Sequence, residues 1–97
     1  MCLSSFQFLG ILMQDGLDDL DGILGLSPDV SQNGPSFIKS LKGASIINQK
    51  IASFFIGNLN QQSTVLFGGY DTSFLKSEIV WLPLVGNTWW QVKMINT

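Results

Sequence analysis

Few side chains in this sequence could do chemistry, and most of those that could are aspartates. The chain has 97 residues, no histidine and a single cysteine, Cys2. These counts exclude histidine-based triads, internal disulfides and the usual thiolate or imidazole zinc sites. Two acidic features remain as candidates. One is the segment Asp71-Thr72-Ser73, and the other is a cluster of aspartates at positions 15, 18, 19 and 21.

The aspartate cluster matches part of a calcium loop but lacks two of its ligands. Residues 19–22, Asp-Leu-Asp-Gly, fit the middle of an EF-hand loop. In that register the first ligand position falls on Leu17 and the final glutamate position on Pro28, and neither side chain binds calcium. We therefore interpret the cluster as a solvated loop, and we expect no metal and no cofactor in this chain.

The composition indicates a folded chain with unusually few charges. Hydrophobic residues make up 45% of it and charged residues 12%, against about a quarter in an average domain. Such a chain must hide much of its surface, in part against missing portions of a larger domain. The net charge is -2 and the five lysines are scattered, so we expect no nucleic-acid partner. No apolar run approaches the roughly 20 residues of a membrane-spanning helix.

The N-terminal half predicts one strand and one short helix. Residues 6–13 are aromatic and aliphatic and stop at an Asp-Gly turn, which is typical of a buried strand. The same run lacks the basic flank and cleavage site of a signal peptide. Residues 27–34 read as a polar loop. Pro35 then begins a helix that ends at Gly43 and carries apolar residues at positions 37, 38 and 41 on one face.

The C-terminal half predicts a β-hairpin followed by further strands. Residues 51–67 contain two apolar runs joined by the polar connection Gly-Asn-Leu-Asn-Gln-Gln, which indicates a hairpin. Residues 71–75 read as a turn or single helical turn, and residues 78–82 and 89–95 as strands. The expected fold class is all-β, mainly antiparallel, with one short helix.

Six segments carry a recognisable pattern: residues 20–28, 36–42, 53–57, 66–71, 81–84 and 89–92. Taken in order, they resemble the pepsin and cathepsin D family of aspartic endopeptidases. They correspond to the second half of that family's N-terminal lobe, continuing into the sheet that joins its two lobes. The resemblance covers about residues 20–95, so the chain is expected to be an interior fragment, with residues 1–97 forming a partial pepsin-like barrel domain.

The resemblance implies a two-aspartate mechanism whose aspartates lie outside this chain. Each lobe of the family supplies one Asp-Thr/Ser-Gly loop, and the two carboxylates share a proton because both cannot ionise at close range. The segment at Asp71 has serine in place of the loop's glycine and follows Gly-Gly-Tyr where the family has apolar strand residues. We expect Asp71 to cap a turn, no catalytic residue in this chain, and no activity of the chain alone.

The resemblance also implies that part of the lining of the substrate cleft lies in this chain. Positions matching Leu20 and Ile23 help to line the family's apolar pocket for the substrate side chain just before the scissile bond. For Ile23 ordinary core packing is an equal alternative, and Leu20 stands where many relatives have an aromatic residue. The family's flap tyrosine does not match Tyr70, which is expected to pack or lie at the surface. The tryptophans at positions 81, 89 and 90 are expected to fill the sheet between the lobes.

Three functions follow as hypotheses. The first is an aspartic endopeptidase whose partners are a peptide or protein substrate and the missing remainder of the two-lobed domain. The second is a non-catalytic relative that binds peptides or has a structural role, and the third is a free-standing β-rich interaction module. The resemblance implies a secreted or acidic vesicular location. The isolated chain is expected to fold poorly, with the hairpin and the helix as its best-formed parts.

Overall fold

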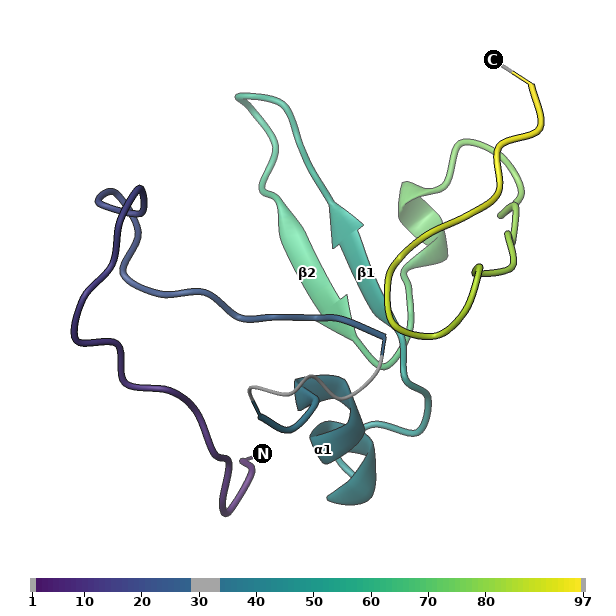
Figure 1. Cartoon of the computed structure of the whole chain (residues 1–97). Coiled ribbons are helices and arrows are strands. Elements are labelled where there is room, and N and C mark those ends of the chain that lie inside the picture. The colour runs from purple at the N-terminus through teal and green to yellow at the C-terminus, as the bar shows by residue number, and fades with distance from the viewer. Residues whose placement is uncertain (1, 29–33, 97) are drawn as a thin grey trace.

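The computed structural model describes residues 2–28 and 34–96 (Figure 1). Its elements, in chain order, are helix α1, strands β1 and β2, and the short 3₁₀ helix η1. Most of the polar loop expected at residues 27–34 lies outside the described residues. One short helix and an antiparallel sheet confirm the predicted fold class as a partial, mostly β domain. No helix in these two ranges is long and apolar enough to cross a membrane.

Helix α1, Phe37–Gly43, confirms the predicted helix but begins after its proline. Ser36 is the N-cap, and its Oγ accepts a hydrogen bond from the Lys39 N–H at 3.3 Å. A serine hydroxyl satisfies a helix N–H that would otherwise have no partner, so the cap falls on Ser36 and Pro35 lies outside the helix. Leu41 is the one buried hydrophobic residue of the described chain, at 8% exposure.

The C-terminal end of α1 is a Schellman motif, in which the chain reverses through a left-handed residue. The Ser45 N–H donates to the carbonyl of Lys42 and the Ile46 N–H donates to that of Leu41, each at 3.0 Å. These are the two bonds that define the motif. Ser45 has a φ of +59°, a conformation that glycine usually supplies. The chain thus leaves α1 toward the hairpin.

The hairpin consists of β1, Ala52–Phe55, and β2, Thr64–Phe67. The strands are antiparallel, with Ala52 opposite Phe67. A hydrogen bond of 2.7 Å from the Gly68 N–H to the Ile51 carbonyl extends their pairing. The hairpin predicted over residues 51–67 is therefore confirmed, with a shorter first strand and a longer connection.

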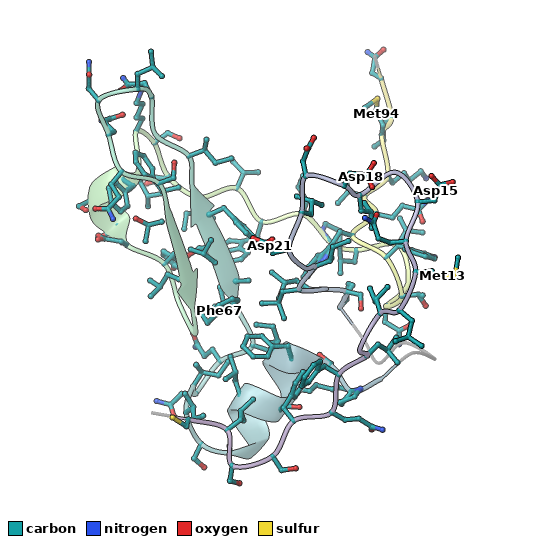
Figure 2. The ribbon with its side chains drawn as sticks, turned by 90° about the vertical axis from the view of Figure 1, so that its left-hand side faces the viewer. Met13, Asp15, Asp18, Asp21, Phe67 and Met94 are labelled. Carbon is teal, nitrogen blue, oxygen red and sulfur yellow. The ribbon has the colours of Figure 1, made fainter. Side chains whose placement is uncertain are left out.

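Aromatic rings connect elements that lie far apart in the sequence. Phe37 of α1 makes edge-to-face contacts with Phe6 at 5.6 Å and with Phe67 of β2 at 5.4 Å between ring centroids. Figure 2 shows Phe67 at the end of its strand, beside the helix. On the hairpin, Phe55 stacks on Phe74 of η1, Thr72–Phe74, at 4.1 Å. Edge-to-face and offset-stacked pairs are the favoured geometries of aromatic rings.

Three predicted strands are not formed in the described residues, and those predictions are wrong for this structure. Residues 6–13, 78–82 and 89–95 form no strand, and Leu12 is 98% exposed. A strand needs a neighbour to accept and donate its backbone hydrogen bonds. Near the C-terminus the Val85 N–H donates to the Gln91 carbonyl at 2.7 Å, but a ladder requires a series of such bonds.

The molecule is open rather than close-packed. Its accessible surface is 8980 Å², whereas a compact monomer of 10.7 kDa exposes about 5500 Å². The radius of gyration is 16.1 Å, against about 12.5 Å for a compact domain of this length. In Figure 1 the N-terminal segment and the C-terminal segment extend on opposite sides of the hairpin. Much apolar surface is therefore left uncovered.

Candidate functional site

A large hollow among the described residues lies beside the segment that carries Ile23. It has a volume of about 850 Å³. Ile23 lines it and is 67% exposed, while Leu20 is 55% exposed but is not part of the lining. The structure thus places one of the two predicted pocket residues at this hollow. The walls consist of residues 6–11, 21–25, 27 and 34–37.

A hydrogen-bonded turn precedes this segment and sets its direction. The Gln14 side chain donates to the Asp18 carboxylate at 3.0 Å and accepts from the Leu17 N–H at 2.9 Å. The Leu20 N–H then donates to the Leu17 carbonyl at 3.0 Å. A side-chain amide that bonds nearby backbone in this way stabilises a turn. Leu20 therefore lies at the end of the turn, and Ile23 lies on the extended chain beyond it.

The aspartates of this region lie around the same turn. Figure 2 shows Asp15 and Asp18 near the tip of the loop and Asp21 on the returning chain. Within residues 2–28 and 34–96, no three His, Cys, Asp or Glu side chains come close enough together to hold a metal ion. The bond between Gln14 and Asp18 gives that carboxylate a role in the turn itself.

Asp71 caps η1, as predicted from the sequence. Its Oδ1 accepts a hydrogen bond from the Ser73 N–H at 2.9 Å. Hydrogen bonding from the Ser73 side chain, and then from its backbone N–H, lowers the pKa of Asp71 below the ordinary value of 3.8. The environment of Asp71 is therefore that of a cap.

A smaller hollow lies between the hairpin and η1, and sequence reasoning missed it. Its volume is about 310 Å³. The stacked rings of Phe55 and Phe74 form part of its wall. The alternation of side chains at positions 53, 55, 64 and 66 could have indicated one wall of this hollow, because alternate residues share one face of a strand. The lining residues are Ser53, Phe54, Phe55, Thr64, Leu66, Tyr70, Asp71, Phe74 and Leu75.

One hydrogen bond and one aromatic contact involve the C-terminal tryptophans. The Trp90 Nε1–H donates to the Leu26 carbonyl at 2.7 Å, which brings the C-terminal segment to the chain that carries Ile23. Tyr70 contacts Trp81 at 6.0 Å between ring centroids and is 42% exposed, so it makes a packing contact and also lies at the surface. The described residues form no sheet around these tryptophans, and Trp89 is 70% exposed.

Comparison with known proteins places residues 11–97 in one family. The family model described as eukaryotic aspartyl protease matches residues 11–97. Similar proteins include a pregnancy-associated glycoprotein of Equus caballus, 37% identical over 80% of this chain and 21% of its own length. Pepsin A of Gallus gallus is 33% identical over 78% of this chain and 22% of its own, and pregnancy-associated glycoprotein 1 of Ovis aries is 33% identical over 95% and 25%. The chain spans between a fifth and a quarter of these relatives.

Proposed function

The chain belongs to the eukaryotic aspartyl protease family, and on this premise we propose that it is part of an aspartic endopeptidase. The observation that carries the proposal is the family match over residues 11–97, with pepsins among the similar proteins. The substrate is a peptide or protein. The reaction is hydrolysis of a peptide bond by a water molecule that two aspartates activate.

The two aspartates have complementary roles in this proposed reaction. The ionised carboxylate takes a proton from the attacking water, and the protonated one donates its proton to the carbonyl oxygen of the substrate. The chain contains no Asp-Thr/Ser-Gly segment to supply either of them. Asp71 has serine where that loop has glycine, and its Oδ1 accepts a hydrogen bond from the Ser73 N–H, which supports a capping role instead. The chain alone is therefore expected to be inactive, and the remainder of the two-lobed domain is its partner.

Leu20 and Ile23 contribute, in this proposal, to the apolar pocket for the substrate side chain before the scissile bond. The support for Ile23 is its place in the wall of the larger hollow. The support for Leu20 is its exposed side chain at the end of the adjoining turn. An aliphatic wall favours an apolar substrate side chain, because burial of apolar surface stabilises the complex.

The test of catalysis compares this chain with a longer protein that contains it. We expect the longer protein to cleave a denatured protein substrate at acidic pH, and the 97-residue chain to show no cleavage in the same assay. Replacing the aspartate of either Asp-Thr/Ser-Gly loop by asparagine should abolish the activity of the longer protein. Acid proteolysis by the 97-residue chain itself, or a longer protein without these loops, would contradict the proposal.

The test of the pocket uses the longer protein and peptides that differ in the residue before the scissile bond. Leu20→Ala and Ile23→Ala should each lower kcat/KM for a large apolar side chain by about 10-fold, with less effect on alanine at that position. Leu12→Ala is the matched control, since Leu12 is 98% exposed and is not part of the hollow's lining. Equal losses for both kinds of peptide would assign Leu20 and Ile23 to packing instead.

Peptide binding without cleavage is a second candidate function. It is favoured by the similarity to proteins named pregnancy-associated glycoproteins, a name that states no proteolytic activity. In that case the longer protein would bind a fluorescent peptide at acidic pH and leave it intact. Substituted aspartates in the two loop positions would accompany that result, which distinguishes the two candidates.

A further inference from the structure

The indole of Trp90 is bonded to the segment that carries Ile23. Its Nε1–H donates to the Leu26 carbonyl at 2.7 Å, although the two residues are 64 positions apart. In Figure 1 the C-terminal segment, in yellow, curves past the end of the blue stretch that contains residues 20–28. Within the described chain, this is the one hydrogen bond that links residues 21–26 to another segment.

The backbone around Trp90 is itself held by two hydrogen bonds. The Val85 N–H donates to the Gln91 carbonyl at 2.7 Å and closes a short loop. The Gln91 N–H donates to the Trp89 carbonyl at 2.9 Å, which makes Trp90 the central residue of a γ-turn. The φ of Trp90 is not positive, so the turn is of the common inverse form. The indole that reaches Leu26 therefore belongs to a closed loop and not to an unconstrained end of the chain.

The segment that receives this bond has little of its own to fix its path. It forms no helix or strand, and glycines at positions 22 and 25 flank Ile23 and Leu24. Glycine gives the backbone more accessible conformations than any other residue. A Cβ at either position would meet no atom within 4 Å, so neighbouring atoms do not confine the backbone there. The position of Ile23 therefore depends on how the two ends of this segment are held.

We propose that Trp90 is a positioning residue for the pocket wall that carries Ile23, and thereby a determinant of specificity for the substrate side chain before the scissile bond. Its indole N–H fixes the Leu26 end of the segment, while the turn bond of the Leu20 N–H fixes the other end. Ile23 lies three residues from Leu26, at most about 11 Å along an extended chain. Trp90 is not part of the lining of the hollow, so it acts through Leu26 and not on the substrate. This inference rests on the proposed function.

The first test uses the longer protein and the two peptides that carry a large apolar residue or alanine before the scissile bond. Trp90→Phe keeps an aromatic ring and removes the N–H. It should lower the ratio of the two kcat/KM values by about 2- to 10-fold, the range expected for one net hydrogen bond. Trp81→Phe is the matched control, because Trp81 is 68% exposed against 67% for Trp90, and its contact is with the ring of Tyr70. An unchanged ratio in Trp90→Phe, or an equal fall in Trp81→Phe, overturns the proposal.

A double variant separates positioning of the pocket from a general effect on folding. In Ile23→Ala the side chain that Trp90 positions is already gone, so adding Trp90→Phe should not lower the ratio further. A residue that only supports the fold would instead reduce cleavage of both peptides together and leave their ratio as it was. That result would overturn the proposal.

A measurement of the hydrogen bond itself keeps this inference separate from the proposed function. In the longer protein, the indole N–H signal that Trp90→Phe removes should exchange with solvent more slowly than that of Trp81, as read by nuclear magnetic resonance. Fast exchange at Trp90 would overturn the positioning role even in an active protease. If the longer protein cleaves neither peptide, the proposed function fails. The positioning role is then decided by the ratio of the affinities for the two peptides, which Trp90→Phe should lower by the same factor; an unchanged ratio, or no binding of either peptide, would contradict it.

Discussion

Ser45 holds a backbone conformation that a residue with a Cβ adopts at a cost. Its φ of +59° places it in the left-handed region, which costs an L-residue about 1–2 kcal/mol. The two Schellman bonds from Ser45 and Ile46 require that conformation. Helix α1 thus retains a local strain that a single substitution can remove.

Ser45→Gly is expected to raise the free energy of unfolding by about 0.5–1 kcal/mol. The gain is smaller than the full strain because glycine also gains freedom in the unfolded chain. Urea denaturation followed by far-ultraviolet circular dichroism measures it. Ser45→Ala keeps the Cβ and is the control. An equal gain in Ser45→Ala would show that the left-handed conformation is not the cause.

Asp71 gives η1 a pH dependence of definite sign. The pKa of Asp71 is lowered, first by the Ser73 side chain and then by its N–H. Its contribution to stability is therefore present above the unfolded pKa and is lost as the pH falls through the folded pKa. In Ser73→Ala the pKa of Asp71 should rise toward 3.8, as measured by a nuclear magnetic resonance titration of the carboxyl carbon. An unchanged pKa would contradict the assigned cause.

At the scale of elements, the hairpin depends on a glycine where β2 ends. Gly68 has a φ of +96°, and a Cβ there would lie 2.9 Å from Cγ2 of Ile47. At its neighbour Gly69, a Cβ would meet no atom within 4 Å, and the φ of this residue is not positive. The two glycines therefore differ in what they can tolerate.

Gly68→Ala should destabilise the chain by about 1–3 kcal/mol, because backbone strain and overpacking add. Gly69→Ala should change stability by less than about 0.5 kcal/mol. The urea midpoints of the two variants, compared with that of the parent chain, provide the measurement. Equal effects at both positions would mean that the turn at Gly68 rearranges without cost.

The elements that the sequence predicted correctly are those whose partners lie nearby in the chain. Helix α1 has its cap, Ser36, and its apolar face within one short segment. The two strands of the hairpin are also neighbours in sequence. Strands predicted at residues 78–82 and 89–95 depend on a distant partner, and none lies beside them in the described chain. The stack of Phe55 on Phe74 was missed because sequence alone does not fix where η1 packs.

The same distinction holds for the candidate site: features set by nearby residues were predicted, and features that depend on distant segments were not. The capping role of Asp71 follows from local turn chemistry and was predicted correctly. Ile23 and Leu20 were selected by family resemblance, and the hollow beside Ile23 is formed by chain segments that are far apart in sequence. No local pattern indicates how residues 6–11 approach residues 21–25, so the shape of this hollow could not be predicted from the sequence.

At the scale of the whole molecule, Phe37 joins the N-terminal segment to the helix and the hairpin. Its ring contacts both Phe6 and Phe67, so the N-terminal segment, α1 and β2 meet at this side chain. Only Leu41 is buried among the hydrophobic residues of the described chain, and little else holds the segments together. Few contacts therefore carry the tertiary structure.

Phe37→Ala is expected to lower the free energy of unfolding by about 1–3 kcal/mol, since two aromatic pairs and their buried area are lost together. Phe8→Ala removes a ring of the same size that is 80% exposed and should have little effect. Urea denaturation of both variants tests the comparison. Similar losses in the two would show that Phe37 does not join the segments.

The hydrogen bond from Trp90 to Leu26 closes a loop of 64 residues. Closing a fully flexible loop of that length costs about 4 kcal/mol of chain entropy, and the folded elements between Leu26 and Trp90 reduce this cost. A single hydrogen bond contributes a net stabilising free energy of about 0.5–1.5 kcal/mol. The hydrogen bond between Trp90 and Leu26 is therefore expected to break far more readily than the hairpin or α1 unfolds. The C-terminal segment can leave the chain that carries Ile23 while both of those elements stay folded.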